Sequence, residues 1–172
     1  GRYKANVVTI EKEWGEAFSL DELEKALQKF KPSILAMVHA ETSTGVCQPM
    51  EGIGELCHQY DCLLLLDTVT SLGGVPLFVD EWKVDLAYSC SQKGLSCPPG
   101  LGPFTMSPRA EERLNSRKDK VPNWYLDVSL LNKYWGSDRV YHHTAPVNMN
   151  FGIREALRLL ANEGLENSWK RH

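Results

Sequence analysis

The stretch Leu63-Leu64-Leu65-Leu66-Asp67 places a carboxylate directly after an unbroken apolar run. A short apolar run without polar alternation is typical of a strand that is buried on both faces of a parallel sheet. We therefore predict a strand over residues 62–66, with Asp67 at its carboxyl end. Apolar runs predict further strands over residues 34–38, 84–88 and 103–106, and residues 1–10 also resemble a strand within a sheet.

Helical patterns separate these strands. Ser19 and Glu22 form a capping-box pattern, and apolar residues then recur at helical spacing as far as Phe30. Pro32 ends that helix, because proline has no amide hydrogen. Further helices are predicted over residues 49–60, from residue 107 onward, over residues 147–160, and from residue 165. The alternation of strands and helices predicts an α/β fold with a mostly parallel sheet and flanking helices.

The composition is that of a globular protein without a strong charge bias. The 172 residues suffice for one domain with a hydrophobic core, 42% of them are hydrophobic, and the formal net charge is −3. Without an excess of positive charge, we expect neither nucleic acid nor a membrane surface as a partner. No apolar run approaches the roughly 20 residues that span a bilayer. The five cysteines form no CxxC pair, which favours reduced thiols in an intracellular compartment.

Polar residues gather where three of the predicted strands end. These clusters are residues 39–45, 67–71 and 89–93. In open α/β sheets ligands bind beyond the carboxyl ends of the strands, so we expect all three clusters on one rim of the sheet. Asp67 in the second cluster and Lys93 in the third would bring a carboxylate and an amine to that rim.

Lys93 and Asp67 are the residue types that a pyridoxal-phosphate enzyme takes from its protein. A lysine amine forms a Schiff base with an aldehyde cofactor, and a carboxylate keeps the pyridine nitrogen of that cofactor protonated. Taken singly, Lys93 would be a solvated surface lysine and Asp67 a turn residue. Their joint position at strand ends favours a catalytic pair that binds pyridoxal 5′-phosphate.

Short motifs run through the chain: Glu41-Thr42-Ser43-Thr44-Gly45-Val46, Leu66-Asp67, Ser71-Leu72-Gly73-Gly74, Ser91-Gln92-Lys93, Cys97-Pro98-Pro99-Gly100, Tyr141-His142-His143-Thr144 and Gly164-Leu165-Glu166-Asn167-Ser168-Trp169. In combination they resemble the class V aminotransferases of pyridoxal-phosphate fold type I. The likeness covers nearly the whole chain. It is strongest to the branch that moves the amino group of alanine or serine to glyoxylate, so the resemblance implies transamination.

The resemblance also implies roles for single residues. Lys93 would bind the cofactor covalently and act as general base, and Asp67 would hold the pyridine nitrogen. The Thr42 hydroxyl would bond the phenolic oxygen of the cofactor, and Ser91 and Gln92 would lie near its phosphate. Without the resemblance, Thr42 would be a capping residue, and Ser91 and Gln92 would only shape a turn.

Tyr141 and Thr144 would reach the phosphate of a neighbouring subunit, as the resemblance implies. A homodimer with shared active sites is therefore expected, although both residues could also be ordinary loop residues. His142 and His143 are adjacent, so they cannot form a metal pair one helical turn apart, and we interpret them as structural. No metal site is predicted.

The resemblance implies that residues 1–172 form part of a pyridoxal-phosphate-binding large domain. A phosphate loop and a ring-stacking tryptophan are expected in an N-terminal segment outside these residues, and a substrate-binding arginine in a C-terminal small domain. This chain alone is therefore expected to be inactive. The expected substrates are small amino acids and 2-oxo acids. The expected location is the peroxisome, with the mitochondrion and the cytosol as alternatives.

Other functions stay open at this point. One is a transaminase that acts on 3-hydroxykynurenine. Another is a different class V chemistry, such as that of a cysteine desulfurase, although desulfurases usually place histidine directly before the lysine and Gln92 stands there. A third is a truncated product that keeps the scaffold without the complete site.

Overall fold

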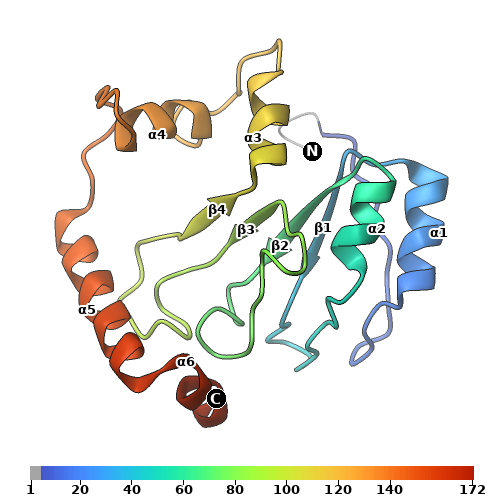
Figure 1. Cartoon of the computed structure of the whole chain (residues 1–172), viewed down its shortest axis with the longest axis horizontal. Helices are drawn as coiled ribbons and strands as arrows, with labels where there is room; N and C mark the ends of the chain where they lie inside the picture. The colour runs from blue at the N-terminus through green and yellow to red at the C-terminus, as the bar shows by residue number, and fades with distance from the viewer. Residues whose placement is uncertain (1–4) are drawn as a thin grey trace.

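A four-stranded sheet forms the centre of the computed structural model, which describes residues 5–172 (Figure 1). Its strands are β1 (Ile34–Val38), β2 (Leu63–Asp67), β3 (Leu86–Tyr88) and β4 (Phe104–Met106), in the order β1-β2-β3-β4. β1, β2 and β3 are parallel, and β4 pairs antiparallel with β3. The predicted mostly parallel α/β fold is thus confirmed.

Helices flank the sheet and follow β1 and β4, whereas segments without a helix join β2 to β3 and β3 to β4. They are α1 (Leu20–Phe30), α2 (Ile53–Gln59), α3 (Pro108–Asn115), α4 (Val128–Trp135), α5 (Val147–Glu163) and α6 (Leu165–Arg171). The sequence patterns predict all of these except α4, in which no residue is buried. Within residues 5–172, no helix is long and apolar enough to cross a membrane.

Local signals fix the start of two helices. The Ser19 side chain accepts a hydrogen bond from the Glu22 amide, and the Glu22 carboxylate accepts one from the Ser19 amide, so the predicted capping box is present. At α3 the Ser107 side chain accepts from the Ala110 amide, with Pro108 at the first helical position. Both helices therefore begin where the sequence predicts.

The main hydrophobic core lies between the sheet and the helices α1 and α2. Leu64 and Leu66 of β2 are fully buried there, together with Leu23 and Leu27 of α1 and Ile53 of α2. Figure 1 shows α1 and α2 next to each other beside β1 and β2. Close packing of these apolar side chains holds the strand ends in fixed positions relative to one another.

Two expectations about the strands are wrong. Residues 5–10 form no strand, and Val7 and Val8 are exposed, because a strand needs a neighbouring strand for its backbone hydrogen bonds; residues 1–4 lie outside the described residues. The strand β1 is not buried on both faces either. Its alternate residues Ile34 and Val38 are exposed, because α1 and α2 cover only one face of the sheet.

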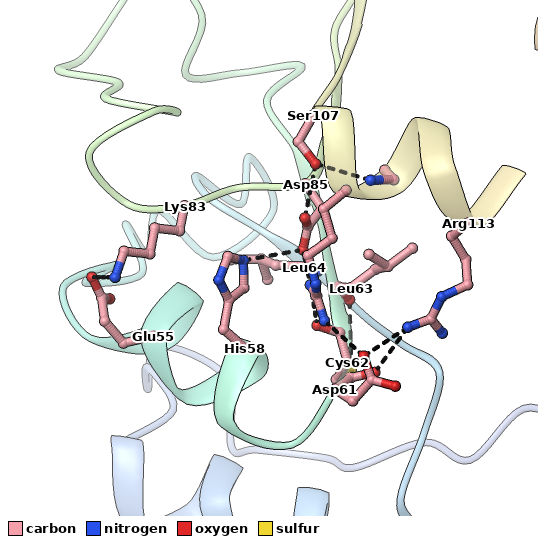
Figure 2. A network of polar contacts seen from close by, with 12 residues as sticks. Glu55, His58, Asp61, Cys62, Leu63, Leu64, Lys83, Asp85, Ser107 and Arg113 are labelled. Atoms are coloured by element: carbon pink, nitrogen blue, oxygen red, sulfur yellow. Dashed lines mark hydrogen bonds and ion pairs between the residues drawn. The ribbon is translucent and has the colours of Figure 1, made fainter.

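A buried carboxylate holds the amino ends of the strands together (Figure 2). Asp85 is only 1% exposed and precedes β3. Its carboxylate accepts hydrogen bonds from the Leu64 amide at 2.9 Å, the Ser107 hydroxyl at 2.9 Å and the Arg109 guanidinium at 2.8 Å. This network ties β2 and β3 to α3 at the edge of the sheet opposite the carboxyl ends.

Candidate active site

The carboxyl ends of the three parallel strands meet at one edge of the sheet. The His39 amide, just after β1, donates to the Asp67 carbonyl at 3.0 Å, and the Thr68 amide, just after β2, donates to the Tyr88 carbonyl at 2.9 Å. The clusters at residues 39–45, 67–71 and 89–93 therefore begin side by side. The prediction that they share one rim is confirmed.

Asp67 is the last residue of β2 and is half-buried. One carboxylate oxygen, Oδ1, accepts a hydrogen bond from the Val69 amide at 2.8 Å, and the other, Oδ2, accepts one from the Tyr88 hydroxyl at 2.6 Å. Two donors on two neighbouring strand ends thus fix the orientation of the carboxylate. A carboxylate has about four lone-pair positions, so it can still accept from a ligand.

Tyr88 is a residue whose role the sequence patterns do not reveal. The hydrogen bond to Asp67, together with partial burial of the phenol, raises the pKa of Tyr88 to about 12. The Tyr88 hydroxyl therefore stays protonated near neutral pH and remains a hydrogen-bond donor. In the sequence, Tyr88 is only the last apolar residue of a strand.

Lys93 lies in the loop that follows β3, and its side chain is exposed. Within residues 5–172, its amine makes no hydrogen bond and no ion pair. The Lys93 carbonyl accepts from the Ser96 amide at 2.8 Å, so the backbone of the loop is held in a turn. The amine is thus free to react, while its attachment point is fixed.

The loop itself is anchored by Ser91, which is fully buried. The Ser91 hydroxyl donates to the Pro98 carbonyl at 2.7 Å, and the Cys97 amide donates to the Ser91 carbonyl at 3.0 Å. The structure therefore gives Ser91 a contact that shapes the loop, and its predicted contact with a phosphate stays a prediction. The side chain of Gln92, also predicted near the phosphate, is exposed beside it.

A pair of hydroxyls joins the first two clusters. Thr42 Oγ1 and Thr70 Oγ1 lie 2.6 Å apart and share a hydrogen bond. Thr42 sits in a tight turn, because the Gly45 amide donates to the Glu41 carbonyl at 2.8 Å. The structure thus brings the predicted residue Thr42 to the same rim as Asp67. It adds Thr70, which the sequence marks only as a member of a polar cluster.

Tyr141 and Thr144 lie apart from this rim, in the connection between α4 and α5 (Figure 1). The Tyr141 hydroxyl and Thr144 Oγ1 are 3.1 Å apart, and both side chains are exposed. In the part of the chain that the structure describes, no hydrogen bond joins either of them to Asp67 or Lys93. A role for these two residues in the site of the same chain has no support in this geometry.

The adjacent histidines have structural contacts, as predicted. His142 is buried and stacks on Trp124, with ring centroids 4.1 Å apart. Its Nε2 faces the Trp124 carbonyl at 3.0 Å, so this nitrogen carries a hydrogen. In neutral His142, Nδ1 is then an acceptor for the His143 Nδ1 hydrogen, 2.8 Å away. The pair fixes the backbone between Tyr141 and Thr144.

His39 is a packing residue as well. Its ring is buried and packs edge-on with the ring of Trp82, with the ring centroids 5.2 Å apart. Burial lowers the pKa of His39, which keeps the ring neutral.

Across the described residues, no group of three or more histidine, cysteine or acidic side chains could hold a metal ion. The rim carries the Lys93 amine, the Asp67 carboxylate and the hydroxyls of Thr42 and Thr70.

This set of groups fits pyridoxal phosphate. An aldehyde cofactor needs an amine that is not engaged elsewhere, and a protonated ring nitrogen needs a fixed carboxylate. Lys93 and Asp67 meet these two needs, and the paired hydroxyls of Thr42 and Thr70 offer a donor for a ring oxygen.

Comparison with known proteins gives one consistent result. The family model for class V aminotransferases matches residues 1–172. The alanine–glyoxylate aminotransferase of Mus musculus is 47% identical over 174 residues, which cover 99% of this chain and 42% of that protein. The crystal structure of alanine–glyoxylate aminotransferase from Nostoc sp. matches with a TM-score of 0.97 at 67% identity, over 99% of this chain and 45% of that chain.

A second solved structure, ureidoglycine–glyoxylate aminotransferase from Bacillus subtilis, matches with a TM-score of 0.95 at 42% identity, over 99% of this chain and 44% of that chain. The chain thus spans less than half the length of the relatives it matches. Its sequence and its fold agree with the same family along the whole chain. This chain belongs to the class V aminotransferases.

Proposed function

We propose that the protein is a pyridoxal-phosphate-dependent aminotransferase that moves the amino group of alanine or serine to glyoxylate. The observation that carries the proposal is the rim itself. The Asp67 carboxylate is fixed by two donors at the same sheet edge from which the Lys93 loop departs. Membership of the class V family supports the same cofactor and the same type of reaction.

Each group of the rim has a defined task in this proposal. Lys93 would hold the cofactor covalently through its amine, and Asp67 would bind the protonated ring nitrogen. Thr42 would donate to the phenolic oxygen, and Gln92, with Ser91, would lie near the phosphate. When bound, pyridoxal phosphate withdraws electrons from the α-carbon of an attached amino acid.

Once the amine of the substrate has displaced Lys93 from the aldehyde carbon, the freed Lys93 amine would act as the general base. Its amine has no competing partner in residues 5–172, so it can take the proton from the substrate α-carbon and return it to the carbon that carried the aldehyde. Asp67 would keep the positive charge on the ring nitrogen throughout, because its two existing hydrogen bonds prevent the carboxylate from turning away.

Glyoxylate as the acceptor has the broadest support. The relatives from Mus musculus, Nostoc sp. and Bacillus subtilis all have glyoxylate in their names, whereas the other partner is alanine in two of them and ureidoglycine in the third. Ureidoglycine is therefore a second candidate for the amino donor. We retain alanine or serine as the proposed donor, because the more similar solved structure is named for alanine.

The proposed working form is a homodimer with shared active sites. Tyr141 and Thr144 support it, since both are exposed and hydrogen-bonded to each other rather than to the rim of their own chain.

The peroxisomal location stays a prediction, and imaging of the tagged protein in its own cells tests it.

An assay of the complete protein tests the reaction. After addition of pyridoxal phosphate, alanine, serine, cysteine, ureidoglycine and 3-hydroxykynurenine are each offered as donor, with glyoxylate or pyruvate as acceptor. We expect the largest kcat/KM for alanine or serine with glyoxylate. Release of sulfur from cysteine without amino transfer, or no visible absorption band with the cofactor, would overturn the proposal.

A further inference from the structure

Tyr88 stands directly beside the carboxylate that the proposed function uses. It is the last residue of β3 and pairs in register with Asp67, the last residue of β2. The Tyr88 hydroxyl donates to Asp67 Oδ2 at 2.6 Å, which is short for an O–H···O hydrogen bond and is typical of a charged acceptor. The contact joins two side chains on the same face of neighbouring strands.

The backbone of Tyr88 is held as firmly as its side chain. Its carbonyl accepts from the Thr68 amide at 2.9 Å and from the Thr68 hydroxyl at 2.8 Å. The Ser89 hydroxyl in turn donates to the Thr68 carbonyl at 2.9 Å. These reciprocal bonds join the ends of β2 and β3, so the backbone from which the phenol extends is fixed beside Asp67.

The charge on Asp67 has no counterpart in the part of the chain that the structure describes. Across residues 5–172, Asp67 takes part in no ion pair, and its two partners, the Val69 amide and the Tyr88 hydroxyl, are neutral donors. A fixed and partly buried carboxylate without a cationic neighbour is suited to a cationic ligand. The ring nitrogen that the proposed function assigns to Asp67 would supply that positive charge.

We propose that Tyr88 is a positioning residue: its hydroxyl orients the Asp67 carboxylate and thereby sets how strongly the protein binds the protonated ring nitrogen of pyridoxal phosphate. This inference rests on the proposed function. Tyr88 would act through Asp67, without a bond of its own to the substrate. Loss of the hydroxyl leaves Oδ2 without its donor. The carboxylate is then held only by the Val69 amide at Oδ1 and can rotate.

A cofactor analogue separates this role from a general structural one. In 1-deazapyridoxal phosphate a C–H group replaces the ring nitrogen, so the analogue keeps the aldehyde and the phosphate but offers Asp67 no cation. Dissociation constants of both compounds are measured by fluorescence quenching for the wild-type protein and for Tyr88→Phe. We expect Tyr88→Phe to weaken the binding of pyridoxal phosphate about tenfold and that of the analogue less than about twofold.

Tyr60→Phe is the matched control. The Tyr60 hydroxyl donates to Glu24 Oε1 at 2.8 Å, so this variant also removes a phenolic hydroxyl from a carboxylate, but between α1 and the residue that follows α2. Neither compound should bind this variant differently from the wild type. In an Asp67→Asn background, Tyr88→Phe should add no further loss, because the group through which it acts has already been changed.

Each outcome of these binding measurements either supports or overturns the positioning role of Tyr88. Equal losses for both compounds would show a structural role and overturn the proposal, as would unchanged binding of pyridoxal phosphate. If Tyr88→Phe does not fold, 3-fluorotyrosine at position 88 keeps the ring and the hydroxyl while changing its donor strength. A change confined to pyridoxal phosphate supports the proposal, and no selective change overturns it. Failure of the wild-type protein to bind either compound would instead contradict the proposed function.

Discussion

At the scale of single residues, the Lys93 amine is the group on which the proposed chemistry depends most directly. We expect Lys93→Ala to lower kcat by a factor of about 10⁴ or more, because both the covalent attachment and the general base are lost. Borohydride reduction of the protein with pyridoxal phosphate, followed by peptide mapping, should place the cofactor on Lys93. A label on another lysine would refute the assignment. Lys25→Ala, at an exposed lysine paired with Asp21, is the control and should keep full activity.

Asp67 gives a second test at this scale. Asp67→Asn keeps the size of the side chain and removes its charge, so the fold should survive while the cofactor binds more weakly. A hydrogen bond to a charged group contributes roughly 1.5–3 kcal/mol, so we expect the dissociation constant of pyridoxal phosphate to rise about tenfold to a hundredfold. Equilibrium titration and thermal unfolding measure the two effects. Unchanged affinity in a folded variant would contradict the role of Asp67.

The residues of the site differ in how far the sequence could predict them. Asp67 ends β2 and Lys93 lies in the loop after β3, and residues at the carboxyl ends of parallel strands lie at the ligand-binding edge of the sheet. The contact between Asp67 and Tyr88 could not be predicted in this way, because it depends on the register of two strands that are paired across 21 residues of sequence. Register is a property of the assembled sheet.

At the scale of helices and strands, the same distinction holds. The helix α1 begins where Ser19 and Glu22 predict, because the capping box needs only residues three apart. The strands β1 and β2 were predicted to within one residue from their apolar runs. In contrast, residues 5–10 look like a strand but form none, since strand formation requires a pairing edge that no local pattern contains.

The amino ends of the strands depend on Asp85, and this dependence can be measured. Asp85→Asn replaces a buried carboxylate that accepts from the Leu64 amide, Ser107 and Arg109. The side-chain amide of the introduced asparagine would place its own hydrogens against one of these donors. The positive charge of Arg109 would also lose its buried partner. We expect a loss of about 3 kcal/mol or more in the free energy of unfolding, measured by urea denaturation.

Asp21→Asn is the control for this variant. Asp21 pairs with Lys25 at 2.6 Å, but both side chains are more than 70% exposed, so water already solvates their charges. The control should unfold at the wild-type urea concentration. If Asp85→Asn did the same, the buried network would not hold β2, β3 and α3 together.

At the scale of the whole molecule, the two ends of the sheet have separate tasks. At the amino ends, the buried Asp85 carboxylate accepts hydrogen bonds from the Leu64 amide, the Ser107 hydroxyl and the Arg109 guanidinium (Figure 2). The carboxyl ends carry Lys93, whose amine has no partner among residues 5–172, and Asp67, which can accept from a further donor. Stability and chemistry therefore depend on different residues, so a variant at Lys93 should leave the unfolding free energy nearly unchanged.

Sharing of active sites between subunits is the remaining property at this scale. Tyr141 and Thr144 are exposed, and the stacked His142 holds the backbone between them. In the proposed dimer this segment would supply hydroxyls to the cofactor phosphate of the other subunit. A site would then combine Lys93 of one chain with Thr144 of its partner, and neither chain alone would hold a complete set.

Mixed dimers of two inactive variants test this sharing. Lys93→Ala subunits and Thr144→Val subunits are unfolded together in equal amounts and reassembled. If the sites are shared, a hybrid dimer has one site with intact Lys93 and Thr144 and one site with neither, so a random mixture should recover about a quarter of the wild-type activity. If each site used residues of one chain only, every site in the hybrid would carry a substitution. Verified hybrids without recovered activity would therefore show that Thr144 does not act across the interface.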